Sequence, residues 1–114
     1  MPFQLDTVFV WVNNLDHAVE WYSRLGIAAG ERHGPWQEMS LEGEARFALH
    51  EGDRPEGEST AVPSFRVEDL DAEILRLGGV GITPTDRQVT DTGMARFAGF
   101  IDPDGNEIQL LERR

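Results

Sequence analysis

Few side chains in this protein are of types that perform chemistry by themselves. There is no cysteine, and the only imidazoles belong to His17, His33 and His50. Ser64 has no histidine and acid partner that the sequence identifies, and no glycine-rich phosphate motif is present. The sequence therefore indicates no nucleophilic or nucleotide chemistry, although a single buried histidine or carboxylate would suffice as a general base.

The stretch that most resembles an ion-binding motif is Asp102-Pro103-Asp104-Gly105. A calcium loop needs glycine at its sixth position and glutamate at its twelfth, whereas this stretch has Gly105 in the fourth and Arg113 in the twelfth. Proline in second place and glycine in fourth are typical of a type I turn. We therefore expect a hairpin whose carboxylates serve the turn.

The elements that position these residues follow from the hydrophobic pattern. The first strand puts valines on one side and Phe9 and Trp11 on the other, so both of its faces are expected to be buried. Asn14 is a helix-capping residue, and the helix that follows it should cover the valine face and end at Gly26. The expected elements are strand 5–12, helix 15–25 and strands near 27–32, 36–42 and 45–50, which together form a βαβββ module.

The same pattern begins again after a polar stretch with proline and glycine, residues 52–61, which is typical of a linker. Asp69 is a capping residue for a second helix, which Gly78-Gly79 should end. The expected elements are strand 62–67, the helix from Leu70, and strands near 80–84, 94–101 and 107–112. The stretch VNNLD at 12–16 recurs as VEDLD at 67–71, so we expect one domain, 1–114, built from module 1 at about 1–51 and module 2 at about 62–114.

Composition narrows the class of partner. The chain has 114 residues, with 21 acidic and 10 basic side chains and a formal net charge of -11. Such a charge disfavours nucleic acid and anionic membranes as partners. It either favours encounter with cationic small molecules or simply keeps the surface solvated and the protein soluble. No apolar run is long enough to span a bilayer and the N-terminus lacks a signal-peptide pattern, so the sequence predicts a cytoplasmic protein.

Four motifs follow one another along the chain: VWVNNLD at 10–16, WY at 21–22, FRVEDLD at 65–71 and DPDGNEIQL at 102–110. Together they resemble the vicinal oxygen chelate superfamily, which includes glyoxalase I, bleomycin-resistance proteins and extradiol dioxygenases. The resemblance implies an α+β fold in which two βαβββ modules form a curved mixed sheet around a cleft, commonly in a homodimer. In catalytic members it also implies a divalent metal, held by four inward-facing residues, that polarises substrate oxygens.

Carried over residue by residue, the resemblance puts the four ligand positions at Thr7, Ala48, Val62 and Gln109. A hydroxyl, two hydrocarbon side chains and one amide make a poor ligand set, because divalent ions of this class need about three or more good donors. Shifting the second position from Ala48 to His50 would still leave at most two useful ligands. We therefore expect neither a metal nor another cofactor.

Strand parity and the resemblance predict a set of residues that face a ligand in the cleft. Phe9 and Trp11 are expected to stack on a planar ligand, although filling the cleft or a subunit contact explains them equally well. Arginines in the set would bind a carboxylate or phosphate, or else neutralise a neighbour such as Glu107. The complete set is Thr7, Phe9, Trp11, Trp36, Arg46, Ala48, His50, Val62, Ser64, Arg66, Phe100, Glu107, Gln109 and Leu111.

These observations favour a metal-free binding protein that sequesters a small cationic or aromatic molecule, as in antibiotic resistance of the bleomycin-binding kind. Two alternatives stay open: a metal-dependent lyase, isomerase or dioxygenase of the superfamily, and a degenerate regulatory or dimerisation domain. An acidic run would either line the mouth of the cleft for a cationic ligand or form a solvated loop. The run consists of Glu42, Glu44, Glu51, Asp53, Glu56 and Glu58.

Overall fold

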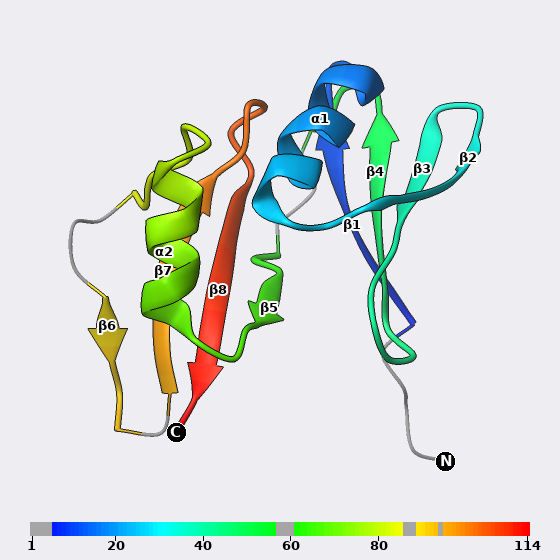
Figure 1. Ribbon diagram of the computed structural model, residues 1–114. Helices are drawn as coiled ribbons and strands as arrows, with labels where there is room; N and C mark the ends of the chain where they lie inside the picture. Colours follow the sequence, from blue (N-terminus) through cyan, green and yellow to red (C-terminus); the bar gives the residue numbers. More distant parts are fainter. Residues whose placement is uncertain (1–5, 57–60, 86–88, 94) are drawn as a thin grey trace, which may run out of the picture. The chain divides into compact units, whose positions relative to one another are not determined.

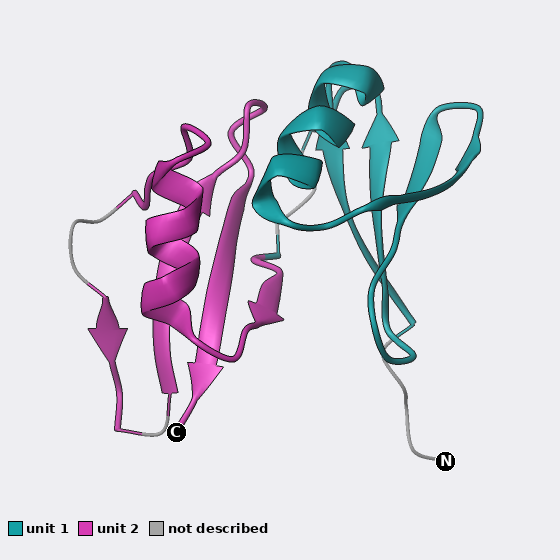
Figure 2. Ribbon diagram, in the orientation of Figure 1, with its two compact units in different colours: residues 1–61 teal, residues 62–114 magenta. Residues whose placement is uncertain are grey.

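The computed structural model describes residues 6–56, 61–85, 89–93 and 95–114. The chain divides into two compact units, Met1–Ala61 and Val62–Arg114 (Figure 2). In each unit one helix and a four-stranded mixed sheet form a βαβββ module (Figure 1). The α+β class and the repeated module predicted from the sequence are confirmed.

The sheet of the first unit has the strand order β1-β4-β3-β2. β1 runs parallel to β4, whereas β3 pairs antiparallel with both β4 and β2. A parallel pair needs a long crossover connection, which α1, β2 and β3 supply here. The elements are β1 (Thr7–Val12), α1 (Leu15–Leu25), β2 (Ala29–His33), β3 (Trp36–Met39) and β4 (Arg46–Glu51).

Local signals set both ends of α1. The side chain of Asn14 accepts a hydrogen bond from the backbone N–H of His17 at 3.0 Å, which satisfies one of the first amides of the helix. Gly26 closes the helix with a φ of 121°, a conformation that L side chains rarely adopt. Tyr22 is fully buried and packs on Phe47 of β4, with ring centroids 5.4 Å apart. Burying each such large side chain contributes about 1.5–3 kcal/mol, so packing anchors the helix that the caps delimit.

The second unit repeats the plan with the strand order β5-β8-β7-β6. β5 runs parallel to β8, and β7 pairs antiparallel with β8 and β6. Leu70 and Leu77 of the helix are fully buried, as are Phe100 and Ile108 of the sheet. The elements are β5 (Ser64–Arg66), α2 (Leu70–Gly78), β6 (Thr90–Asp91), β7 (Ala95–Ile101) and β8 (Glu107–Arg113).

The prediction of a strand near 80–84 is wrong. Val80 and Ile82 instead donate backbone hydrogen bonds to the carbonyl of Leu77, at 3.0 and 2.9 Å, and so close the end of α2. The outer strand of this sheet is the two-residue β6, which begins at residue 90. The β propensity of residues 80–84 is therefore outweighed by the hydrogen bonds that cap the preceding helix.

Three other expectations concern strand ends and the linker. The predicted strand 62–67 is shorter in the structure, and Val62 precedes it with 42% of its surface exposed. Residue 5 of the predicted first strand and residues 57–60 of the predicted linker lie outside the described residues. The expectation that both faces of β1 are buried is wrong, because Phe9 is 39% exposed.

The hairpin predicted at Asp102 is confirmed. This side chain is only 3% exposed, and its Oδ1 accepts hydrogen bonds from the backbone N–H groups of Asp104 and Asn106 at 2.9 and 2.8 Å. Its Oδ2 accepts a third from Asn106 Nδ2 at 2.9 Å. Gly105 supplies the positive φ, 87°, that the turn requires. The carboxylate of Asp102 therefore organises the turn between β7 and β8.

Candidate functional site

Aromatic rings gather on the face of the first sheet that points away from α1. The ring of His50 lies 4.1 Å from that of Trp11, 5.5 Å from Trp36 and 5.9 Å from Phe9, measured between centroids. Phe9 in turn lies 5.7 Å from Trp11 and 5.3 Å from Trp36. We call these four residues the aromatic face. They come from β1, β3 and β4, three adjacent strands of one sheet.

Strand register explains why these rings meet. Trp11 is the cross-strand partner of His50, and His50 is also the partner of Trp36. Residues opposite one another on neighbouring strands project to the same side of a sheet. The register therefore places side chains on the aromatic face that are far apart in sequence, as the parity argument predicted for Phe9, Trp11 and His50.

The imidazole of His50 is partly enclosed by its neighbours. Its Nδ1 atom is buried and has no hydrogen-bond partner within the part of the chain that the structure describes. Aromatic rings surround it at the centroid distances given above. A polar ring held within aromatic rings at a part-exposed surface adds hydrogen-bonding capacity to an otherwise apolar platform.

Gly52 supports the position of Trp11. Its φ is 146°, and a Cβ atom added there would meet Trp11 Cζ3 at 3.3 Å. The backbone of Gly52 is held next to β1 by a hydrogen bond from its N–H to the carbonyl of Val12, at 3.0 Å. The sequence showed a glycine at the start of a linker, but nothing in it indicated contact with an indole.

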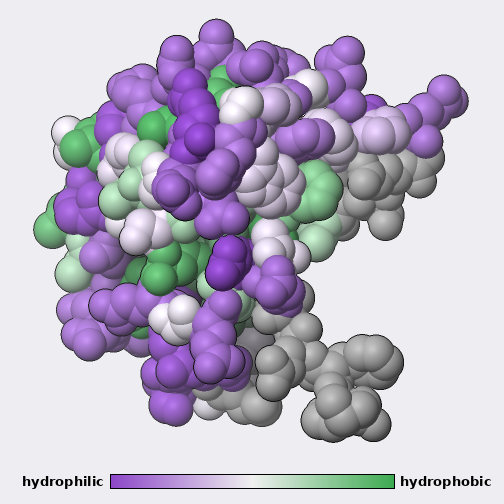
Figure 3. Space-filling view, turned by 90° about the vertical axis from the view of Figure 1, so that its right-hand side faces the viewer, coloured by the Kyte–Doolittle hydropathy of each residue, from purple (hydrophilic) through white to green (hydrophobic). Residues whose placement is uncertain are grey.

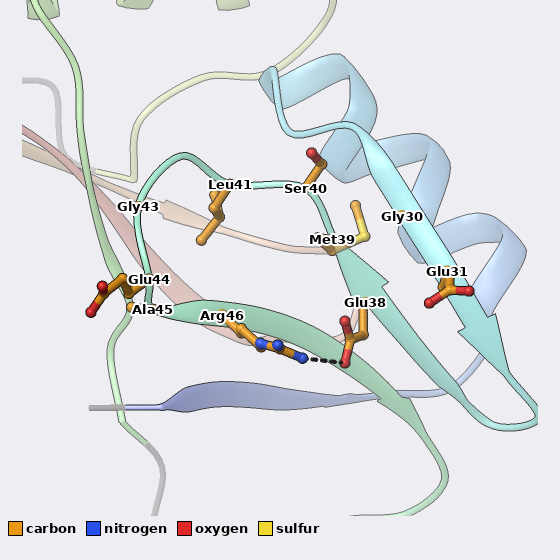
Figure 4. A pocket seen from close by; sticks show the side chains of 10 residues that line it. All are labelled: Gly30, Glu31, Glu38, Met39, Ser40, Leu41, Gly43, Glu44, Ala45 and Arg46. Carbon is orange, nitrogen blue, oxygen red and sulfur yellow. Dashed lines mark ion pairs between the residues drawn. The ribbon is translucent and has the colours of Figure 1, made fainter. Parts of the chain in front are cut away.

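The same unit has a pocket of about 530 Å³ (Figure 4), and two of its lining residues, Glu38 and Arg46, have the strand parity of Trp36 and His50 and so lie on the same side of the sheet. Glu38 of β3 and Arg46 of β4 point toward one another in it and form an ion pair of 3.6 Å. Arg46 thus neutralises a neighbouring glutamate, which was one of the two alternatives for the arginines of the set, and the glutamate is Glu38 rather than the Glu107 given as an example. Strand parity in 36–42, with Trp36 facing the ligand, could have placed Glu38 on the same side. The pocket is lined by Gly30, Glu31, Glu38, Met39, Ser40, Leu41, Gly43, Glu44, Ala45 and Arg46.

The predicted acidic run does not act as one group. Glu44 lines the pocket, whereas Glu51 accepts a hydrogen bond from the first amide of α1. Asp53 and Glu56 are exposed, and Glu58 lies outside the described residues. The pocket nevertheless carries more carboxylates than cations, since Glu31 and Glu38 also line it.

The corresponding face of the second sheet is mostly polar. Ser64 is the cross-strand partner of Gln109, and its hydroxyl donates a hydrogen bond to Gln109 Oε1 at 2.9 Å. Arg66 is the partner of Leu111, so both lie on the same face as Gln109. Glu107 shares this parity at the exposed start of β8. Within this unit, the structure brings together the predicted residues of β5 and β8.

Phe100 does not belong to this face. It is fully buried and is the partner of Ile108, which is also fully buried in the core. Gly99 and Ile101 occupy the positions of β7 that face the same way as Gln109. The expectation that Phe100 joins the ligand-binding set is therefore wrong, and the aromatic ring of β7 with the right parity is Phe97.

The four positions that the resemblance assigned to a metal do not suit one. Thr7 lies on the edge of the aromatic face, Ala48 is fully buried and Val62 is exposed ahead of β5. Gln109 uses its carbonyl oxygen to accept the Ser64 hydroxyl. Across the described ranges, no three His, Cys, Asp or Glu side chains gather as a metal site would require. The donor set does not fit a divalent ion.

Shifted pKa values occur away from the aromatic face and away from the side of the second sheet that carries Ser64 and Gln109. Hydrogen bonds from Arg96 lower the pKa of Asp71, which lies 2.9 Å from its Nη2, and raise the pKa of Arg96 itself. Arg114 lowers the pKa of Asp91 in the same way. These pairs join strands to α2 or to one another at the surface, so they are structural ion pairs rather than acid–base machinery.

The side of the molecule drawn in Figure 3 is dominated by hydrophilic residues, with apolar residues in smaller patches between them. Neither α1 nor α2, the helices of the described part, has the length and apolar character needed to cross a membrane.

Comparison with known proteins gives consistent results. Residues 4–110 match the family model described as Glyoxalase/Bleomycin resistance protein/Dioxygenase superfamily. No functionally curated protein gives a significant match. Among solved structures, a glyoxalase/bleomycin resistance protein from Catenulispora acidiphila is 29% identical, with a TM-score of 0.75 over 97% of this chain and 100% of that one.

Two further structures share the fold at lower identity. An antibiotic-binding protein from Streptomyces sp. CB03234 is 23% identical, with a TM-score of 0.79 over 99% of this chain and 98% of that one. A glyoxalase/bleomycin resistance protein/dioxygenase from Alicyclobacillus acidocaldarius is 17% identical, with a TM-score of 0.75 over 96% and 91% of the two chains. At these identities the likeness establishes the architecture alone.

Proposed function

Since this chain belongs to the Glyoxalase/Bleomycin resistance protein/Dioxygenase superfamily, we propose that it is a metal-free protein that binds a small planar aromatic molecule. The aromatic face is the single observation that carries the proposal. Three large rings and an imidazole lie together on one side of a sheet, and Phe9 among them is 39% exposed. Stacking on such rings contributes about 0.5–1.5 kcal/mol per pair beyond the burial of area.

The donor set supports binding over metal-dependent catalysis. The resemblance assigns the ligand positions to a threonine, an alanine, a valine and a glutamine, and only the first and last carry an oxygen donor. A Lewis-acid mechanism needs an ion fixed by several strong ligands. The residues of this chain are thus better suited to enclosing a ligand than to activating it.

The charge of the chain and the pocket favour a ligand with a positive group. A net charge of -11 raises the local concentration of cations, and the pocket of the first unit contains Glu31, Glu38 and Glu44 with only Arg46 opposing them. One structure with the same fold is described as an antibiotic-binding protein, which is consistent with a small-molecule ligand. An aromatic cation would use both the rings and the carboxylates.

A thermal-shift screen against cationic glycopeptides, aromatic antibiotics and glutathione adducts tests the proposal. We expect an aromatic hit that quenches tryptophan fluorescence and whose affinity falls at least about tenfold in Trp11→Leu and Trp36→Leu, because each loses a stacking surface. Trp21→Phe is the matched control, since Trp21 lies in α1 and is 8% exposed. Addition of a chelator should leave the affinity unchanged.

Two results would overturn the proposal. Binding that is equally strong in the Trp11 variant and in the Trp21 control would remove the aromatic face from the site. A stoichiometric divalent ion in protein purified without chelator, together with chelator-sensitive turnover of a methylglyoxal–glutathione adduct or a catechol, would identify a metalloenzyme instead.

A further inference from the structure

Arg66 lies on the side of the second sheet that also carries Ser64 and Gln109, and we call this side the open face of that sheet. Among the described residues, no ion pair involves Arg66, although the chain has 21 acidic and 10 basic side chains. In so acidic a chain, an arginine without a carboxylate partner keeps all its forked N–H donors available. The arginines that do form ion pairs are Arg24, Arg32, Arg46, Arg76, Arg96 and Arg114.

A second donor lies on the neighbouring strand. The hydroxyl of Ser64 donates to Gln109 Oε1 at 2.9 Å, which occupies the acceptor end of this amide and leaves its NH₂ group as a donor. Ser64 is the partner of Gln109 in the register, and Arg66 is the partner of Leu111 two residues further along. Arg66 and Gln109 therefore project from adjacent strands to the same side of the sheet.

Two apolar side chains share this otherwise polar face with Arg66 and Gln109. Leu111 lies between Arg66 and Phe97 in the register, and both apolar side chains are part-buried on the open face. Gly99, the partner of Gln109 on β7, contributes no side chain of its own. These two side chains offer an apolar contact beside the charged and polar donors of the same face.

We propose that Arg66 and the amide of Gln109 form a recognition site for the anionic oxygen group of a small organic acid, a carboxylate or phosphate on an apolar body. The guanidinium matches two oxygens of such a group with parallel N–H donors, and the amide adds a third donor. Phe97 and Leu111 contact the apolar body. The inference goes beyond the proposed function and rests on the second sheet alone.

Glu107 limits which anion fits. It shares the face with Gln109, and its Oε1 lies 3.9 Å from the point that a Cβ at Gly99 would occupy. Its charge and the net charge of -11 oppose an incoming anion. The site therefore favours a singly charged acid over a dianion, and removal of Glu107's charge should tighten binding.

Side-chain NMR of the full ¹⁵N-labelled chain tests this directly. We expect benzoate to shift the Arg66 Nε–H and Gln109 NH₂ signals saturably, phenyl phosphate to do so more weakly, and benzamide to have no effect. The amide of Gln37 is the internal control, since its Nε2 already donates to the backbone carbonyls of Gly30 and Glu38 at 3.0 and 2.9 Å.

Three variants complete the test. Arg66→Gln should weaken benzoate binding at least about tenfold, as expected for loss of a charged hydrogen-bond partner. Glu107→Gln should strengthen it. Arg54→Gln makes the same charge change at an exposed arginine of the other unit and should leave binding unchanged.

Two outcomes would overturn the site: no saturable shift at Gln109 with either anion, or equal affinities in the Arg66 and Arg54 variants. The indole N–H signals of Trp11 and Trp36 report on the aromatic face in the same spectra. Failure of those signals to respond to the aromatic hit of the thermal-shift screen would count against the proposed function and not against this site.

Discussion

Glu51 reaches back from the end of β4 to the start of α1, where its Oε2 accepts a hydrogen bond from the backbone N–H of Leu15 at 2.9 Å. The second unit repeats the contact, because Glu112 of β8 accepts a hydrogen bond from Leu70 N–H at 2.9 Å. In each unit a capping residue, Asn14 or Asp69, and a distant glutamate share the first amides of the helix.

Replacing either glutamate should loosen the helix that it holds. We expect Glu51→Ala and Glu112→Ala each to lower the free energy of unfolding by about 1–2 kcal/mol, because a charge-assisted hydrogen bond to an otherwise unsatisfied amide is lost. Urea unfolding followed by circular dichroism measures this. The exposed Glu56 provides a control in Glu56→Ala, and equal stability of all three variants would refute the role of the contact.

Substitution of Gly52 should affect ligand binding as well as stability. A methyl group there would meet Trp11 Cζ3 at 3.3 Å, so Gly52→Ala should tilt the indole. The affinity for an aromatic ligand should then fall by about tenfold or less, which is within the range of one stacking contact. Gly34→Ala is the control, since Gly34 also has a positive φ, 59°, but has nothing within 4 Å. If both variants bind the ligand equally well, Gly52 does not position Trp11.

Acid should destabilise the second unit through its arginine-paired carboxylates. The pKa values of Asp71 and Asp91 are lowered by hydrogen bonds from Arg96 and Arg114. A lowered folded-state pKa contributes stability that is present above the unfolded value, about 3.9 for Asp, and that is lost as pH falls through the folded value. The melting temperature of the protein should therefore fall as the pH is lowered below about 4.

The pH experiment has a direct comparison. Asp71→Asn and Asp91→Asn should flatten the decline, whereas Asp53→Asn, at an exposed position, should melt with the same pH profile as the parent protein. Because both paired carboxylates are exposed, the differences should be small. A profile that is unchanged in all variants would contradict the assignment.

We expect the protein to form a homodimer. A chain of 114 residues buries a modest core, and pairing of two copies adds to it. Sedimentation equilibrium at micromolar concentration should give twice the 12.8 kDa mass of the chain. A mass of one chain across the concentration range would show that the protein is a monomer.

Local signals in the sequence predicted the first helix well, whereas features that depend on the pairing of distant strands were not predicted. Asn14 and Gly26 stand next to the helix they delimit, so α1 was predicted with its observed bounds. The ion pair of Arg46 with Glu38 depends on which strands are neighbours and in what register. Neither strand segment, taken alone, shows which strand is its neighbour or in which register the two pair.

The misplacement of Phe100 has a related cause. The segment ARFAGFI of β7 carries apolar residues on both faces, so alternation does not show which face is buried. The pairing of Phe100 with Ile108 across the hairpin decides it. The contact between Gly52 and Trp11 was likewise beyond prediction, because it depends on the backbone path after β4.

Ala48 has a consequence for how this sheet can evolve. It lies on the same face as its partner Phe9, yet it is completely buried, and the resemblance puts a metal ligand at this position. A histidine or glutamate introduced there would have to displace the Phe9 ring or the ion pair between Arg46 and Glu38. Coordination of an ion and packing of the aromatic rings thus compete for the same patch of the sheet, and a variant of this protein that gains a metal ligand at this position would have to rearrange the aromatic face.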